Sequence, residues 1–197
     1  MMTGIVKDTR ELMVRTALEL LRERGYAGMS FGDVIERSGA PRGSIYHHFP
    51  GGKQQLVTEA VTLYAERIRE RLATAVHSGS SLDAVRTLID VTRDGLRASD
   101  FRAGCAIAAV VLDVTPEDRV LLDLSAASLG GWRGVLATGF RRDGATAAQA
   151  RRLAALVVGA VEGALILARA DRDVTPVVDI GHELESHLRT TLPAPPS

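Results

Sequence analysis

Cysteine is almost absent from this chain, because Cys105 is the only one among 197 residues. This scarcity excludes a disulfide framework and a cysteine-rich zinc site. The histidine and acidic residues show no metal-ligand spacing, and His182 and His187, five positions apart, do not share one helix face. The sequence contains no glycine-rich phosphate loop, serine nucleophile elbow or paired catalytic carboxylates. We therefore expect no metal, no cofactor and no enzymatic activity.

Segments that direct a protein to a membrane are also scarce. The opening residues, MMTGIVKDTR, contain no apolar stretch of about 7–15 residues such as a signal peptide needs. Residues 153–168 form an apolar run, but it is shorter than the roughly 20 residues of a membrane span, contains Glu162 and is bounded by arginines. This run predicts a buried interface helix, and we expect a cytoplasmic protein with no membrane partner.

A surplus of charge of one sign is missing as well, since 24 lysine and arginine residues balance 24 acidic residues. Residues 1–53 carry eight basic and six acidic side chains, an excess too small to predict a partner. Aromatic residues make up only 4% of the chain, yet four of the eight lie in this first quarter. Hydrophobic residues make up 46%, which excludes a disordered chain. We expect a small N-terminal core beside a larger one.

Apolar residues recur at three- and four-residue intervals along most of the chain, as in amphipathic helices. Ser30, Thr146 and the Thr-Pro pairs at 115–116 and 175–176 are typical first residues of helices. The run 110–112 could form a strand, but no second strand is available to pair with it. We predict an all-α fold of nine helices, at about residues 9–24, 31–37, 41–49, 53–76, 82–96, 103–112, 115–144, 146–170 and 175–192.

Residues 31–49 contain two short predicted helices joined by a tight turn at Gly39, which matches a helix-turn-helix unit. The pattern alone is weak, because many helical hairpins share it. In the second helix, Pro41 occupies the first turn, and Ile45 and Phe49, four residues apart, face inward. The remaining positions carry donors of different reach and a glycine that permits close approach: Arg42, Gly43, Ser44, Tyr46 and His47. Such a surface suits contacts with phosphates and base edges.

The segment SFGDVIERSGAPRGSIYHHFPGGKQQL, residues 30–56, resembles the DNA-binding signature of TetR-family transcriptional regulators. The positions that carry the resemblance are Val34, Ile35, Gly39, Gly43, Ser44, Ile45, Tyr46, His48, Phe49, Lys53 and Leu56. Two features depart from the family pattern: Ala40-Pro41 replaces a hydrophobic-serine pair, and the link at residues 50–52 is one residue longer. The paired glycines of that link make the chain most similar to the LmrA/YxaF-like branch of the family. Two later features support the same similarity, Gly104-Cys105 and Ala168-Arg169.

The resemblance implies a two-domain architecture, with a helix-turn-helix DNA-binding domain at residues 1–53 and a helical ligand-binding and dimerisation domain at residues 54–197. The start of the helix at 53–76 would pack with the first domain. Side chains that would meet base edges in the major groove are Arg42, Gly43 and Ser44. Side chains that would hold phosphates are Ser30, Tyr46, His47 and Lys53. Ser30 is a helix cap in either case.

Lys53 occupies an electrostatically unfavourable position. It is one of two lysines in the chain and lies at the N-terminal end of a predicted helix, where the helix dipole does not favour a positive charge. A nearby anion accounts for this position better than stability does. The link at residues 50–52, one residue longer than in the family, directly precedes Lys53 and therefore affects the phosphate contact expected of it.

The C-terminal part has no comparable motif. Apolar positions that could line a ligand cavity are Leu88, Cys105, Ala109, Trp132, Leu136 and Phe140. Cys105, Trp132 and Phe140 fit ordinary core positions as well. Small residues repeat every four positions at Ala155, Gly159 and Gly163, so another helix can approach closely there, either within one subunit or across a dimer. In the resembling family the last two helices pair with their symmetry mates, which implies a homodimer.

These observations predict a transcriptional regulator that binds double-stranded operator DNA. The expected form is a homodimeric repressor that a small, largely apolar effector releases from a palindromic operator. The alternative is a helical enzyme or ligand carrier whose N-terminal unit is purely structural. The donor-rich surface at residues 42–47 and the missing catalytic constellation argue against this alternative.

Overall fold

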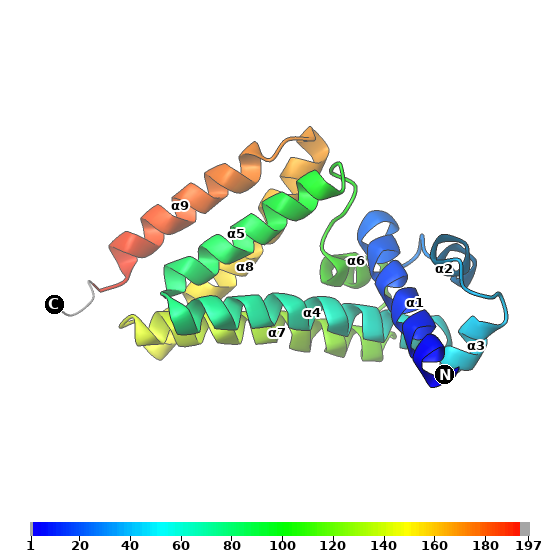
Figure 1. Ribbon diagram of the computed structural model, residues 1–197. Coiled ribbons are helices and arrows are strands. Elements are labelled where there is room, and N and C mark those ends of the chain that lie inside the picture. Colours follow the sequence, from blue (N-terminus) through cyan, green and yellow to red (C-terminus); the bar gives the residue numbers. More distant parts are fainter. Residues whose placement is uncertain (1, 194–197) are drawn as a thin grey trace. The chain divides into compact units, whose positions relative to one another are not determined.

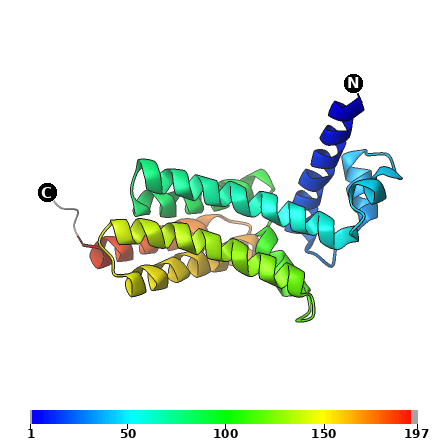
Figure 2. The same cartoon turned by 90° about the horizontal axis from the view of Figure 1, so that it is seen from below.

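The computed structural model describes residues 2–193, with side chains from Thr9 onward. Within that part of the chain the regular elements are nine helices, as the sequence predicts, and none is a strand (Figures 1 and 2). The helices are α1 (Met2–Arg24), α2 (Phe31–Ser38), α3 (Ser44–His48), α4 (Gly52–Ser78), α5 (Ser81–Ala98), α6 (Ala106–Asp113), α7 (Arg119–Arg142), α8 (Ala147–Asp171) and α9 (Thr175–Thr191).

The chain forms two compact units. The first contains the chain up to Tyr64 together with Cys105–Ala126, and the second contains Ala65–Gly104 together with the chain from Ala127. The helices α4 and α7 therefore contribute to both units. This division differs from the continuous boundary expected at residue 53, because α6 packs against α1 and joins the first unit.

Asp113, the last residue of α6, fastens this helix to the end of α1. Its Oδ2 accepts a hydrogen bond of 2.9 Å from the backbone N–H of Ala27. Gly25 lies beside the same carboxylate with a φ of 79°, and a Cβ atom there would lie 2.5 Å from Asp113 Oδ2. Both the backbone conformation and the available space require glycine at this position. Asp113 was not among the residues expected to matter.

The first unit is built around α1, which packs against α2, α3 and α6. Ile45 and Phe49 are fully buried, which confirms that they face inward. Further fully buried side chains of this core are Met13, Ala17, Leu21, Val34, Leu56 and Val57. The core leaves the opposite side of the short helix α3 open to solvent.

In the second unit, α5 and α8 pack against each other and both pack against α9. Trp132 is buried, and its indole Nε1 donates a hydrogen bond of 2.9 Å to the carbonyl of Ala65. This bond satisfies the polar atom of an otherwise apolar side chain. Leu136 and Phe140 are fully buried on the same helix, α7.

Among the described residues, α8 is the one helix long and apolar enough to cross a membrane, judged by length and composition only. One side of α8 is buried, and this helix packs against α5 and α9. The apolar run therefore has a place in the core of the second unit. The opposite side exposes about half of three large apolar side chains, Leu156 (46%), Ile166 (59%) and Leu167 (54%).

Four predicted helix starts are wrong, including that of α1, which begins at Met2 instead of Thr9. The third helix begins at Ser44 instead of Pro41, because the N–H and Oγ of Ser44 both donate to the carbonyl of Pro41, at 2.9 and 2.6 Å, and close a turn. Helix α7 begins at Arg119 instead of near Thr115. The N–H of Asp118 donates to the carbonyl of Thr115 at 3.0 Å and closes a separate turn. Each Pro-containing segment thus forms a turn ahead of the helix.

The segment before α6 is also non-helical, so α6 starts at Ala106 and not at residue 103. Asp100 and Phe101 both have positive φ, of 50° and 58°, which is uncommon for residues with side chains. The guanidinium of Arg169 donates to the carbonyls of Phe101, at 3.4 Å, and Arg102, at 2.9 Å. Arg169 thereby fixes the shape of this connection.

The predicted starts of the last two helices are confirmed. The Thr146 hydroxyl accepts a hydrogen bond of 3.3 Å from the N–H of Gln149, and Pro176 lies in the first turn of α9. The Gln149 side chain donates to the carbonyl of Thr191 at 3.2 Å. This residue therefore ties the start of α8 to the end of α9.

Candidate nucleic-acid interface

Ser30 caps α2. Its Oγ accepts a hydrogen bond of 3.2 Å from the N–H of Asp33, and Asp33 Oδ2 accepts one of 2.8 Å from the N–H of Ser30. These hydrogen bonds from Ser30, together with nearby Arg24, hold the pKa of the Asp33 carboxyl below its usual range. Arg24 also forms a 2.8 Å ion pair with Asp33. The capping role expected of Ser30 is confirmed, and its contact with phosphate stays a prediction.

The turn between α2 and α3 depends on Gly39. This residue has a φ of 66° and a ψ of 14°, and its N–H donates to the carbonyl of Ile35 at 3.0 Å. A left-handed conformation of this kind strongly favours glycine. The turn therefore sets the direction in which the chain enters α3.

The exposed side of the segment 42–47 carries the donors that the sequence singled out. Tyr46 is 67% exposed, and its ring makes an edge contact with Phe31, with 5.5 Å between centroids. Arg42 and His47 are exposed, and Arg42 makes no ion pair or side-chain hydrogen bond within the described residues. A Cβ atom at Gly43 would meet nothing within 4 Å, so a partner can approach the backbone there. The arrangement offers a cation, a hydroxyl, an imidazole and bare backbone to one surface.

Ser44 lies half-buried at the start of α3, and its hydroxyl hydrogen is committed to the carbonyl of Pro41. Its oxygen can still accept a hydrogen bond. Arg42 and Gly43 lie in the turn before the helix, and not in its first turn as expected. The short helix α3 therefore presents Tyr46 and His47, while the preceding turn presents Arg42.

Lys53 has a partner that the sequence did not predict. Its Nζ donates to the carbonyl of Tyr26 at 2.6 Å and lies 4.2 Å from the centre of the Tyr26 ring. Burial lowers the pKa of Lys53, against the opposing effect of Asp113 and Asp33. The contacts with the carbonyl and the ring stabilise the fold. They therefore give Lys53 a structural role, whereas the helix dipole led us to expect only a nearby anion. An ammonium group has three donors, so further contacts with an anion remain available.

His48 is half-buried between two aromatic neighbours, with centroid distances of 5.6 Å to His47 and 6.3 Å to Phe49. Burial lowers its pKa, and the charges of His47 and Arg10 lower it further. Arg10 lies over the ring of Phe49 and pairs with Glu59 at 2.6 Å. His48 therefore packs beside the core in surroundings that favour its neutral form.

The small residues expected at a dimer interface lie on the exposed side of α8. Ala155, Gly159 and Gly163 are all exposed, and a Cβ atom at either glycine would meet nothing within 4 Å. The half-exposed side chains of Leu156, Ile166 and Leu167 belong to the same helix. No element of the described chain covers these glycines.

The six residues named as candidates for a ligand cavity separate between the two units. Leu88, Trp132, Leu136 and Phe140 are buried in the second unit. Cys105 is buried and Ala109 is half-buried, and both belong to the first unit at the beginning of α6. Four of the six thus belong to the core of the same unit.

Comparison with known proteins agrees with this arrangement. The sequence profile described as "Bacterial regulatory proteins, tetR family" matches residues 14–60, and the profile described as "Transcriptional regulator LmrA/YxaF-like, C-terminal domain" matches residues 81–183. The chain belongs to the TetR family of transcriptional regulators. The second match confirms the similarity to the LmrA/YxaF-like branch, and the first covers the residues that form the candidate interface.

Individual TetR-family proteins are similar over almost the whole chain. An uncharacterised HTH-type transcriptional regulator of Mycobacterium tuberculosis, Rv0196, is 41% identical over 95% of this chain and 98% of its own length. A TetR transcriptional regulator from Chloroflexus aurantiacus has a TM-score of 0.75 and 28% identity, over 94% of this chain and 96% of that chain. The regulator CifR, solved as a cysteine mutant complexed with 26 bp operator DNA, has a TM-score of 0.72 and 21% identity, over 93% and 96%.

Membership of the TetR family confirms the all-helical fold and the function of a DNA-binding transcriptional regulator. The homologues are named as transcriptional regulators, which points away from catalysis. The residues that sequence reasoning missed are Asp113, which holds the end of α1, and Tyr26, which holds Lys53. Neither contact has a local sequence signal, because each joins residues more than twenty positions apart.

Proposed function

We propose that this TetR-family regulator is a homodimeric repressor that binds a palindromic operator and leaves it when a small, largely apolar effector binds. The observation that carries the DNA-binding part is the exposed donor segment at residues 42–47, supported from behind by fully buried Ile45 and Phe49. The similarity to CifR, a regulator solved on operator DNA, supports the same reading.

On DNA, we propose that Arg42, Gly43 and Ser44 meet base edges in the major groove. A guanidinium can bind one guanine through two hydrogen bonds, and Arg42 has no competing partner in the described chain. Tyr46 and His47 would bind phosphates beside the groove, together with Ser30 and Lys53. Contacts with phosphate position a protein on the duplex, whereas contacts with base edges select the sequence.

The dimer would form through α8 and α9, with Ala155, Gly159 and Gly163 at its centre. Exposed glycines with open space above them allow the backbone of a second helix to come close. Apolar side chains that would be buried beside them are Leu156, Ile166 and Leu167. A two-fold axis there would present two recognition segments, residues 42–47 of each subunit, to half-sites about 34 Å apart, one helical turn of DNA.

The effector would act on the domain that follows residue 53, while residues 1–53 read the DNA. Candidate contacts are Leu88, Cys105, Ala109, Trp132, Leu136 and Phe140, and their apolar character supports a largely apolar ligand. Binding that favours a conformation unable to span both half-sites lowers the affinity for DNA by the same factor by which DNA lowers the affinity for the effector. A cytoplasmic location suits a protein whose most apolar helix is buried on one side.

A gel-shift titration with the intergenic DNA upstream of the protein's own gene tests this function. We expect the wild type to shift a specific fragment and Arg42→Ala to bind it at least about tenfold more weakly. The matched control is Arg141→Ala, which removes the same charge from an exposed position on α7 in the second unit. Equal binding by the wild type and Arg42→Ala would remove Arg42 from the interface.

The alternative function is a helical enzyme or ligand carrier with a purely structural N-terminal unit. It predicts that the wild type binds operator and random DNA of equal length equally weakly. A specific shift that resists competition by random DNA excludes it. The same titration therefore decides between the two functions.

A further inference from the structure

A pocket of about 500 Å³ lies between α4 and α5 in the second unit. The two helices diverge from the turn at Gly79-Ser80 (Figure 1). Residues from both helices line it: Arg67, Glu70, Arg71, Thr74 and Ala75 from α4, and Thr87 from α5. It is an open depression, because four of its lining residues, Arg67, Glu70, Arg71 and Thr74, are exposed. Its volume lies within the roughly 300–1,000 Å³ of pockets that bind small molecules.

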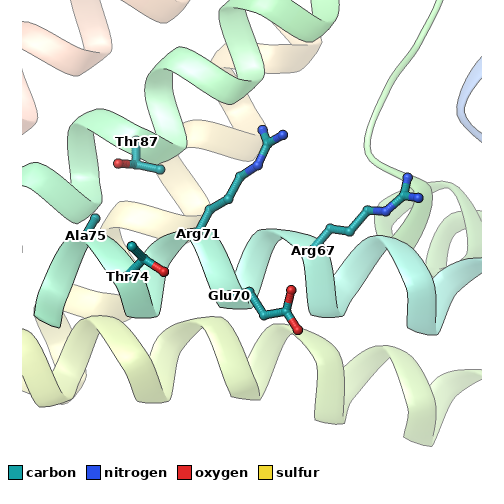
Figure 3. A pocket seen from close by; sticks show the side chains of 6 residues that line it. All are labelled: Arg67, Glu70, Arg71, Thr74, Ala75 and Thr87. Atoms are coloured by element: carbon teal, nitrogen blue, oxygen red, sulfur yellow. The ribbon is translucent and has the colours of Figure 1, made fainter. Parts of the chain in front are cut away.

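Two arginines give the pocket a positive charge. Arg67 and Arg71 lie one helical turn apart, and Figure 3 shows both guanidiniums extending from the same side of α4, whereas Glu70 extends from the other side. Neither guanidinium makes an ion pair or a hydrogen bond within the part of the chain that the structure describes. Their neighbour Arg69, in contrast, is paired with Glu66 at 2.7 Å. Glu66 is thus committed to Arg69, and Glu70, the one acid among the lining residues, leaves the pocket with a net positive charge.

Like charges at positions four apart on a helix repel each other and destabilise the helix. An oxyanion between them removes this repulsion and offers acceptors to both guanidiniums. A guanidinium and a carboxylate or phosphate match in geometry, since two parallel N–H groups meet two oxygens. The pocket already presents two such forks on one side.

The α5 side of the pocket supplies an acceptor. The Thr87 hydroxyl donates its hydrogen to the carbonyl of Asp83 at 2.8 Å, so only its oxygen lone pairs remain for a ligand. A ligand that fits both sides carries an anionic group toward α4 and a hydrogen-bond donor or an apolar group toward α5. The apolar residues named from the sequence as a ligand cavity do not line this pocket.

We propose that this pocket binds a small organic oxyanion, a carboxylate or a phosphate, held by Arg67 and Arg71. The proposal concerns binding to the second unit and holds whether or not the chain represses transcription. A role of the anion as an effector would rest on the proposed function. The pocket lies on α4, the helix that follows the recognition segment and α3 in the chain and continues into the second unit.

The test uses three probes of one shape: benzoate, phenyl phosphate and the neutral benzamide. Binding is measured on the full-length protein by NMR, through the side-chain Nε–Hε resonances of its arginines, with those of Arg67 and Arg71 assigned from Arg67→Lys and Arg71→Lys. We expect benzoate or phenyl phosphate to shift both resonances saturably, and benzamide to leave them in place. Binding by both anions or by one alone identifies which oxyanion the site prefers.

The variant Arg71→Gln, which keeps a polar side chain of similar reach, should weaken binding of the preferred anion about tenfold. Arg141→Gln removes the same charge from an exposed position on α7 that does not line the pocket, and it should leave binding unchanged. The proposal is overturned if the resonances of Arg67 and Arg71 move no more than that of Arg141, or if benzamide binds as well as benzoate. Specific operator binding by the wild type without added anion reports separately on the proposed function.

Discussion

The recognition segment of the first unit and α8 of the second unit expose opposite kinds of residue. Around α3 the exposed positions carry a guanidinium, a phenol and an imidazole, and the apolar residues Ile45 and Phe49 are fully buried. On α8 the exposed positions include two glycines and large apolar side chains, such as Ile166 at 59%. One surface suits a charged, hydrated partner, and the other suits a second apolar helix.

This contrast also determines how specific each region's sequence is. Contact with phosphates and base edges requires particular donors at particular positions, so the segment at residues 30–56 has a recognisable motif. Contact between helices requires only small or apolar residues at the right spacing, which many sequences satisfy. The first region can therefore be interpreted residue by residue, and the second only through its periodicity and its exposure in the structure.

The largest expected effect comes from closing the glycine surface of α8. Gly159→Leu places a large side chain where a second helix backbone would approach, so the dimer should dissociate. Operator binding should fall by at least roughly a hundredfold, because the two half-sites no longer bind together. Light scattering and an operator titration measure the two effects.

The control for this change is Gly134→Leu on α7, another exposed glycine whose Cβ would meet nothing within 4 Å. It should remain dimeric and bind the operator normally. A folded Gly159→Leu protein that is still fully dimeric would exclude this side of α8 from the interface. The apolar region would then need another explanation.

The next effect separates base contacts from phosphate contacts within the recognition segment. Arg42→Ala should relax the preference at one base pair of each half-site, by about 1–3 kcal/mol. Tyr46→Phe should weaken binding to all sequences alike and leave their ranking intact, because a hydroxyl bound to phosphate carries no sequence information. Titrations against single-base variants of the operator distinguish the two. If Tyr46→Phe changed the base preference and Arg42→Ala weakened all sequences alike, then α3 would contact the bases and the turn would contact the phosphates.

The sequence predicted features that depend on residues close together in the chain. Ser30 caps α2, Gly39 makes the turn, and Ile45 faces the core, as local chemistry requires. It did not predict the hydrogen bond from Ala27 to Asp113, which joins residues 86 positions apart, or the position of Arg67 and Arg71 in one pocket. The start of α3 was also misplaced, since a proline fits both a turn and a first helical turn, and the Ser44 hydroxyl decides between them.

Lys53 combines a contact within the fold with a proposed contact to phosphate. Its removal should therefore have a smaller effect with two components, one on stability and one on DNA binding. Lys53→Ala loses the hydrogen bond to the Tyr26 carbonyl and should lower the free energy of unfolding by about 1–2 kcal/mol. If the remaining N–H groups bind phosphate, as we propose, the slope of log affinity against log salt should fall by about one per subunit. Denaturation and salt titrations measure these separately. An unchanged slope with reduced stability would limit Lys53 to holding the end of α1.

The smallest expected effect compares two equivalent caps, one in each unit. Ser80 and Asp83 form the same reciprocal hydrogen bonds at the start of α5 as Ser30 and Asp33 form at the start of α2. Ser30→Ala and Ser80→Ala should each lower stability by about 0.5–2 kcal/mol, the usual cost of losing a helix cap. Only Ser30→Ala should weaken operator binding beyond what its stability explains, because Ser30 directly precedes Phe31, whose ring contacts Tyr46, whereas Ser80 belongs to the second unit. Equal operator binding by the two variants would reduce Ser30 to a helix cap.

The pH dependence of these two variants follows from the same hydrogen bonds. The bonds from each serine hold the pKa of Asp33 and of Asp83 below its usual value. Each ionised carboxylate therefore stabilises the folded state fully above the unfolded pKa of about 3.9, and this contribution is lost as the pH falls through the lower folded pKa. Replacing either serine brings the folded pKa closer to the unfolded value, so the stability difference from the wild type should narrow as the pH falls below about 4. Urea denaturation across this range measures the narrowing. A difference that stays constant down to the acid limit would mean that each serine acts on its helix without acting through the carboxylate.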